Sequence, residues 1–247
     1  MEINSEGIGD QFQEQTKYHR PNMPLSTPGS SRRPGSYETS PQGPEIVKLP
    51  DPANCDAHPL WSVIARRRSR RDFTNDPLTL SQLSQLIWAT QGTTLQLGAI
   101  ALRAAPSAGA LYPIETYLTI NRVETLFPGV YHYNPRDRVL EKLNEGKHFG
   151  SELAAAALHQ DMVSDGAATF VWTAVIPRTK WKYRQRCYRY IYLDAGHIGE
   201  NLYLAAEAMG LGCCTVGAFF DEEVNRIIGV DGSQETVIYL GVVGRVS

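Results

Sequence analysis

The 247-residue sequence predicts an α+β or α/β fold, in which helices and strands interleave around one core. Two observations carry this prediction. Runs with the apolar spacing of helices alternate along the chain with short runs of β-forming residues. Three expected strands, 114–121, 129–135 and 139–143, follow one another through short connections, which favours antiparallel pairing.

The segment before the core, residues 1–54, is expected to be an arm. It is rich in Pro, Ser and Gly and shows almost no apolar periodicity. It therefore has too little apolar surface to bury for that burial to offset the loss of conformational entropy on ordering. The pattern changes in the stretch "HPLWSVIARRR", where Leu60, Val63 and Ile64 are spaced for a short helix. We therefore expect the globular domain to occupy residues 55–247.

Helix signals are clear at several places after this point. Thr79 and Gln82 form a capping box, and the apolar stripe that follows them predicts a helix ending at Gly92. Further helices are expected over 151–160, 188–209 and 221–228, and further strands over 168–176 and 236–244. The helix over 188–209 is apolar nearly all round, which is typical of a helix inside a protein or in an interface.

Composition and charge narrow the function. The 24 basic and 26 acidic residues give a net charge of −2, which indicates no overall attraction to nucleic acid or to a membrane. No apolar run approaches the roughly 20 residues of a membrane-spanning helix. The four cysteines show no CxxC pair and no disulfide framework, so we expect a reduced, cytoplasmic protein. They are Cys55, Cys187, Cys213 and Cys214.

The sequence does not predict a metal site, a dinucleotide-binding site or a hydrolase site. Asp194, His197 and Asn201 share one helix face, but a single His without a second His or Cys at ligand spacing predicts no metal. The stretch "GLGCCTVG" lacks the GxGxxG spacing of a dinucleotide site and follows a helix instead of a strand. The GxSxG motif of hydrolases is absent from the sequence.

The stretch "RRRSRRDF" concentrates positive charge around Ser69. Five arginines in six positions repel one another unless an anion sits among them. Their guanidinium groups suit a phosphate, and the Ser hydroxyl can add a further bond. A solvated basic surface explains the same residues equally well, so both interpretations stay open. The arginines are Arg66, Arg67, Arg68, Arg70 and Arg71.

The stretch "RAAPSAGALYPIETYLTI" places very small side chains immediately before an expected strand. Small residues let a planar cofactor ring approach the backbone, and Gly109 permits a turn that other residues resist. A tight turn leading into the strand at 114 is the simpler explanation of the same pattern.

Several of these stretches together resemble the nitroreductase superfamily and, within it, the SagB-type (ThcOx-like) dehydrogenases. They are "RRSRRDF", "LSQLIWATQG", "RAAPSAGALYPIETYL", "GVYHYNP", "WKYRQRCYRYIYLDAGHIGENLYLAAEAMGLG" and "LGVVG". The resemblance covers residues 60 to 245 and implies an α+β, nitroreductase-like domain over 55–247 with a mostly antiparallel sheet. It also implies a homodimer with FMN at the subunit interface, beside the long helix, and NAD(P)H as a possible electron donor.

The resemblance assigns roles to individual residues. It places Arg67, Arg68, Ser69 and Arg71 at the FMN phosphate and ribityl chain. It places Pro106, Ser107, Ala108, Gly109 and Ala110 along the isoalloxazine ring, where small side chains leave room for the flavin edge. It places Val216, Gly217 and Ala218 in a loop that covers the flavin, and Arg245 near the phosphate.

The resemblance also marks Lys182 and Tyr183 as catalytic, because SagB-type enzymes carry an adjacent Lys and Tyr needed for azoline oxidation. Aromatising a thiazoline or oxazoline sends a hydride to the flavin and a proton to a base. A Gly commonly follows this pair in the family, whereas Arg184 follows it here. A solvated loop tip is the alternative interpretation of the pair.

Three functions remain at this point. The first is FMN-dependent oxidation of azolines in a modified peptide, or of a small molecule. The second is NAD(P)H-dependent reduction of nitroaromatics or quinones. The third is a non-catalytic protein that binds a flavin or a phosphorylated partner through the arginines.

Overall fold

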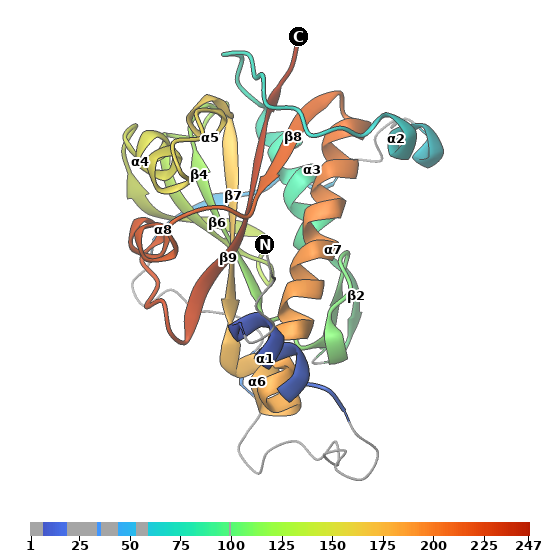
Figure 1. Ribbon diagram of the computed structural model, residues 1–247. Helices are drawn as coiled ribbons and strands as arrows, with labels where there is room; N and C mark the ends of the chain where they lie inside the picture. Colours follow the sequence, from blue (N-terminus) through green and yellow to red (C-terminus); the bar gives the residue numbers. More distant parts are fainter. Residues whose placement is uncertain (1–6, 19–33, 36–43, 53–58, 99) are drawn as a thin grey trace.

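A computed structural model describes residues 7–18, 34–35, 44–52, 59–98 and 100–247. At its centre is a seven-stranded sheet in the order β1-β6-β5-β4-β7-β9-β8, in which every neighbouring pair is antiparallel (Figure 1). The strands are β1 (Glu45–Lys48), β4 (Ile114–Ile120), β5 (Gly129–Asn134), β6 (Val139–Glu145), β7 (Ala168–Val175), β8 (Leu211–Val216) and β9 (Glu235–Arg245). The expected α+β class with an antiparallel sheet is confirmed.

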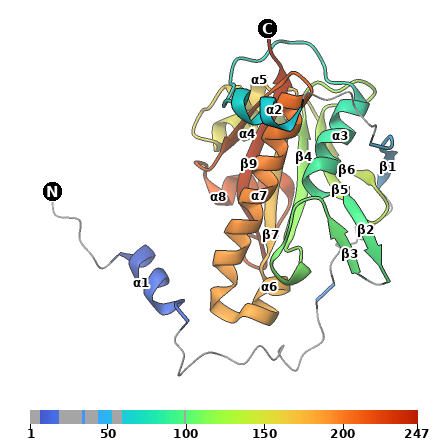
Figure 2. The same ribbon diagram turned by 90° about the vertical axis from the view of Figure 1, so that its right-hand side faces the viewer.

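Helices cover both faces of the sheet. Helices α3 and α7 pack on one face and α4, α5 and α8 on the other, with the strands between them (Figure 1). The hairpin of β2 (Thr93–Leu97) and β3 (Ile100–Arg103) stands outside the sheet (Figure 2). No helix in the described ranges has the length and apolar character needed to cross a bilayer. The helices are α1 (Ile8–Gln15), α2 (Leu60–Arg66), α3 (Leu80–Gln91), α4 (Phe149–Ala156), α5 (Met162–Asp165), α6 (Ile176–Tyr183), α7 (Cys187–Ala208) and α8 (Asp221–Ile228).

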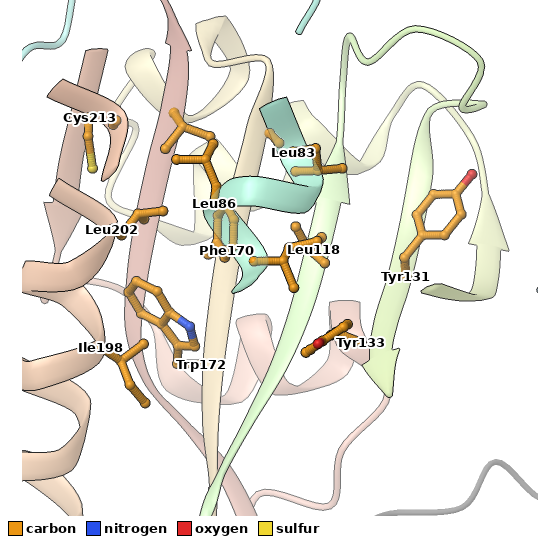
Figure 3. Packing of buried hydrophobic residues seen from close by; sticks show 14 of the residues in the cluster. Leu83, Leu86, Leu118, Tyr131, Tyr133, Phe170, Trp172, Ile198, Leu202 and Cys213 are labelled. Carbon is orange, nitrogen blue, oxygen red and sulfur yellow. The ribbon is translucent and has the colours of Figure 1, made fainter. Parts of the chain in front are cut away.

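Helix α7 is held against the sheet by a closely packed apolar cluster (Figure 3). Leu202 of α7, Leu86 of α3, Leu118 of β4, and Phe170 and Trp172 of β7 are all fully buried. Truncating one such leucine to alanine typically costs about 2–5 kcal/mol. This packing fixes the position of α7, and with it the polar side chains on the flanks of the helix.

Elements with a strong local signal lie where the sequence predicts them. In α3, the Gln82 N–H donates to Thr79 Oγ1 (3.1 Å) and the Thr79 N–H donates to Gln82 Oε1 (3.0 Å), so the capping box is confirmed. Helix α8 begins at Asp221, as predicted. Helix α7 spans Cys187–Ala208, one residue earlier than predicted at each end.

Other elements differ from the prediction. The expected helix over 151–160 is shorter, because Leu158 and His159 have positive φ angles and α4 ends at Ala156. Helix α6, strand β8 and the β2–β3 hairpin were not predicted. The residues of β8, "LGCCTV", are mostly small, and their pairing with the distant strand β9 makes them a strand.

Helix α7 is not buried on all sides within the single chain. Tyr192 and Leu193 of α7 are 57% and 59% exposed. The inward face, which includes Ile198 and Leu202, packs on the sheet, while the opposite face of the helix is open. An interface therefore remains the alternative explanation for its outward apolar residues.

The segment expected to be an arm contains two regular elements. Strand β1 pairs with β6 and forms one edge of the sheet. The end of α1 contacts the start of α7, where Arg189 Nε donates to Thr16 Oγ1 (2.7 Å) and Arg186 Nη1 donates to the Thr16 carbonyl. Residues 53 and 54, at the expected boundary, lie outside the described residues.

Candidate active site

The small-residue loop, residues 106–110, joins β3 to β4 and is anchored on α7. Ser107 Oγ donates to Asp194 Oδ2 (2.6 Å), and the Ala108 N–H donates to Asp194 Oδ1 (3.1 Å). Gly109 has φ +65° and Ala110 has φ +51°, so the backbone turns through the left-handed region. The loop is thus fixed at one end by a carboxylate and is tightly turned.

Asp194 is the functional candidate whose role the sequence did not reveal. It was considered only as a metal ligand, together with His197 and Asn201. Instead, the Asp194 carboxylate holds the loop, Asn201 Nδ2 donates to the Ala89 carbonyl (2.8 Å), and His197 is exposed. Burial raises the pKa of Asp194, although its bonds from Ser107 and Ala108 act in the opposite direction. A charged residue on the inward face of an apolar helix is the signal that points to such a role.

Lys182 and Tyr183 lie directly against this loop. A Cβ placed on Gly109 would stand 2.8 Å from Lys182 Nζ and 2.8 Å from Tyr183 Oη. Both side chains are half-buried at the end of α6, and Lys182 Nζ lies 5.3 Å from the centroid of the Tyr183 ring. The pair is therefore not a solvated loop tip.

The arginine segment, residues 66–71, packs beside the C-terminal end of α7. Ser69 Oγ lies 3.0 Å from Tyr203 Oη, and the Arg67 guanidinium lies over the Tyr203 ring, 5.1 Å from its centroid. Tyr203 Oη also accepts the Thr215 N–H of β8 (2.9 Å). Tyr203 thus connects Ser69 to β8.

The charges of this segment are only partly balanced within the chain. Glu207 accepts from Arg66 Nε (3.3 Å) and lies 3.8 Å from Arg70 Nη2. Arg68 Nη1 donates to backbone carbonyls at 2.7 and 3.3 Å, and Arg71 Nη1 donates to the Ser69 carbonyl at 3.5 Å. In the part of the chain that the structure describes, Arg68 and Arg71 have no carboxylate partner, so an excess of positive charge remains exposed.

The remaining predicted residues lie at the ends of β8 and β9. Val216 is buried at the end of β8, whereas Gly217 and Ala218 are exposed beyond it. Arg245, at the end of β9, donates from Nε to the Pro77 carbonyl (2.9 Å) and from Nη2 to Gln82 Oε1 (3.3 Å). The Arg245 guanidinium thus has partners of its own near the start of α3.

The arginine segment and the small-residue loop attach to opposite sides of α7. Their anchors, Tyr203 and Asp194, are nine positions apart, which corresponds to about 13 Å along the axis and half a turn around it. Between the anchors, α7 exposes Gly196, His197 and Glu200. One chain therefore does not bring the two groups of predicted residues onto the same helix face.

The cysteines offer no reactive thiol among the residues described. Cys187, Cys213 and Cys214 are free and buried. Burial raises the pKa of Cys187 to about 11 and the pKa of Cys213 well above its ordinary value. Cys55 lies outside the described residues. No group of His, Cys, Asp and Glu side chains within the described ranges is arranged to hold a metal ion.

A comparison with known families gives the site a context. Residues 64–245 match the Nitroreductase family, and this match includes the arginine segment, the small-residue loop and the Lys182–Tyr183 pair. The chain belongs to the nitroreductase family. It is therefore an oxidoreductase, and a purely non-catalytic interaction protein is set aside.

Relatives of different kinds share the nitroreductase-family domain. A nitroreductase-family protein of Methanocaldococcus jannaschii is 36% identical over 200 residues, which are 81% of this chain and 96% of the relative. The trifolitoxin-processing protein TfxB of Rhizobium leguminosarum bv. trifolii is 30% identical over 147 residues, which are 58% of this chain and 39% of TfxB. This chain thus spans well under two thirds of TfxB.

A solved structure shows the same architecture. A nitroreductase-family protein from Anabaena variabilis has a TM-score of 0.78 and 26% identity, and the match covers 100% of this chain and 50% of that one. This match supports the nitroreductase fold that the sequence predicts.

The residues present suit a flavin mononucleotide. The exposed guanidinium groups of Arg68 and Arg71 are donors of the kind that bind phosphate. Gly109 is exposed, and its neighbours Ala108 and Ala110 add only methyl groups, so a flat ring can approach the loop. The guanidinium groups thus suit the phosphate of FMN, and the small-residue loop suits its flat ring.

Proposed function

We propose that this chain is an FMN-dependent, SagB-type dehydrogenase that oxidises thiazoline or oxazoline rings of a modified peptide to azoles. The contact between Gly109 and the Lys182–Tyr183 pair carries the proposal. These residues are far apart in the sequence, and each was assigned to the site separately. Their contact in the fold supports both assignments.

The residues at this contact suit the proton half of the reaction. The chemistry that bound FMN would supply is that of a hydride acceptor for the azoline ring. The proton that leaves the ring requires a base within hydrogen-bond reach. Lys182 Nζ and Tyr183 Oη are the groups at the surface of the loop that can take it, and their half-burial keeps them in place.

The complete site is proposed to form between two copies of the chain. Because Asp194 and Tyr203 lie on opposite sides of α7, the loop of one protomer meets the arginine segment of its partner. The outward face of α7, with Tyr192 and Leu193 exposed, provides an apolar surface for this homodimer. Arg245 and residues 216–218 complete the proposed cofactor site, and a cytoplasmic location remains part of the proposal.

The peptide substrate is supported by the relative TfxB, whose name describes the processing of trifolitoxin.

A second candidate is the NAD(P)H-dependent reduction of nitroaromatics or quinones. The relative from Methanocaldococcus jannaschii favours it, because its name describes a nitroreductase and the match covers 81% of this chain and 96% of that relative. Arg184, which follows the Lys–Tyr pair where the family commonly has Gly, also favours a substrate other than an azoline.

The test is a pair of assays on the purified, full-length protein. Flavin released by heat is identified by chromatography, and turnover is then measured with a thiazoline-containing peptide and, separately, with NADPH and a quinone. The proposal predicts bound FMN and formation of the thiazole. Rapid NADPH oxidation with the quinone and no thiazole would favour the second candidate, whereas protein that neither carries nor binds FMN would overturn both.

A further inference from the structure

Arg178, in the first turn of α6, is a buried cation that contacts the end of the small-residue loop and the sheet. Its side chain is 2% exposed, and its Nη1 donates to the Tyr112 carbonyl (3.2 Å) and pairs with Glu115 Oε1. Tyr112 follows the small-residue loop, and Glu115 lies on β4. One guanidinium thus ties α6 to the loop and to the sheet.

Arg178 is placed to control where Lys182 lies. The two residues are four positions apart on α6, so they lie one turn apart on the same side of the helix. Tyr112 has φ +47°, a conformation that costs energy for a residue with a side chain. The bond from Arg178 to Tyr112 therefore helps to hold the end of the loop, on which Lys182 and Tyr183 rest at Gly109.

The ion pair is set in a larger buried network. His132 Nε2 lies 3.0 Å from Glu115 Oε2, and His132 Nδ1 lies 3.3 Å from Glu141 Oε2. Asn134 Nδ2 donates to Glu141 Oε1 (3.0 Å). Removing charged groups from water is costly, and apolar packing often stabilises a core equally well. A requirement for stability alone therefore does not explain charges at this position.

We propose that Arg178, fixed by Glu115, is a positioning residue that sets Lys182 against the small-residue loop. The inference rests on the proposed function for the role of Lys182, but not for the geometry. Arg178 acts through the placement of α6, and no contact of its own with a substrate is required.

The test measures the reactivity of Lys182 in the full-length protein. The protein is treated with a trace of acetic anhydride, and the acetylation of Lys182 and Lys180 is compared by mass spectrometry. Lys180 is exposed on the same helix and serves as the internal reference. In R178Q, we expect the Lys182 to Lys180 ratio to rise several-fold, because Lys182 leaves the loop. E115Q should act in the same direction.

Two further variants sharpen the result. R178K keeps a cation opposite Glu115 and should return the ratio toward that of the wild type. R226Q changes an exposed arginine on α8 and should leave the ratio unchanged. If R178Q does not fold, the double variant R178Q/E115Q removes both charges and carries the same test.

The outcomes separate positioning from general stability and from the proposed function. An unchanged ratio in folded R178Q and E115Q would overturn the inference, as would an equal rise at Lys180 and Lys182, which reports only unfolding of α6. Wild-type protein without bound FMN or thiazole formation would count against the proposed function alone, because the labelling ratio needs neither.

Discussion

Gly109 and Lys182 lie in close contact: a Cβ on Gly109 would stand 2.8 Å from Lys182 Nζ, so the end of the lysine side chain would have to shift. The small side chains of residues 106–110 therefore leave space for two neighbours. One is the Lys182–Tyr183 pair, and the other is the flavin ring of the proposed function.

Substituting Gly109 should therefore lower turnover by more than its loss of stability explains. G109A and G98A both place a side chain at positive φ, +65° and +58°, at a cost of about 1–2 kcal/mol each. A Cβ on Gly98 meets nothing within 4 Å. We expect both variants to lose similar stability in urea, but only G109A to lose turnover. Equal turnover in the two variants would show that the contact with Lys182 is dispensable.

Removing the Asp194 carboxylate should loosen the loop. D194A leaves the half-buried Ala108 N–H and Ser107 hydroxyl without their acceptor, which costs about 1–3 kcal/mol. Hydrogen exchange at the Ala108 amide should become faster, and unfolding in urea should begin earlier. D137A, an exposed change in a turn, is the control. If D194A matched D137A in both measurements, the anchoring role would be disproved.

The exposed arginines should determine FMN affinity without affecting the fold. R68Q and R71Q each remove a potential charge-assisted bond to phosphate, which is worth about 1.5–3 kcal/mol, or roughly tenfold or more in affinity. Their stability should be unchanged, since both side chains are exposed. Titration of apoprotein with FMN, followed by flavin fluorescence, measures the effect, with the exposed-turn variant R136Q as control. Wild-type affinity in both variants would contradict a phosphate site here.

Stability should fall as the pH rises above neutrality, because of His132. Burial alone would lower the pKa of His132, but bonds and charges from Glu115 and Glu141 outweigh it and raise the pKa. The stabilisation is therefore complete below the unfolded pKa of about 6.5 and is lost as the pH rises through the folded value. The slope is at most about 1.4 kcal/mol per pH unit.

Urea unfolding from pH 6 upward checks this dependence. H132N should lose the slope that His132 contributes, whereas H159N, at an exposed histidine, should keep it. The same slope in the wild type and H132N would place its origin elsewhere.

The fold was predictable where the signal is local. The capping box of α3 and the Asp221 start of α8 need only nearby residues, and both are confirmed. Strand β8 was missed because its small residues become a strand only by pairing with β9. Helix α6 was missed because its few turns carry a proline and little apolar periodicity.

The site was predictable in its parts but not in its arrangement. A resemblance of motifs identified Lys182, Tyr183 and the small-residue loop, yet only the fold shows that they meet. Asp194 was considered only as a metal ligand, because its partner Ser107 is distant in the sequence. The charges around Arg178 lie on three strands and one helix, so no sequence spacing connects them.

We propose that the arginine segment of one protomer and the small-residue loop of its partner hold the same FMN. Mixed dimers test it directly. R68Q/R71Q and G109V chains, carrying different tags, are co-expressed, and dimers with both tags are purified and assayed for bound FMN. If the two halves come from different chains, each mixed dimer has one intact site and binds about half the FMN of the wild type. Mixed dimers that bind no more FMN than either parent variant would contradict the claim.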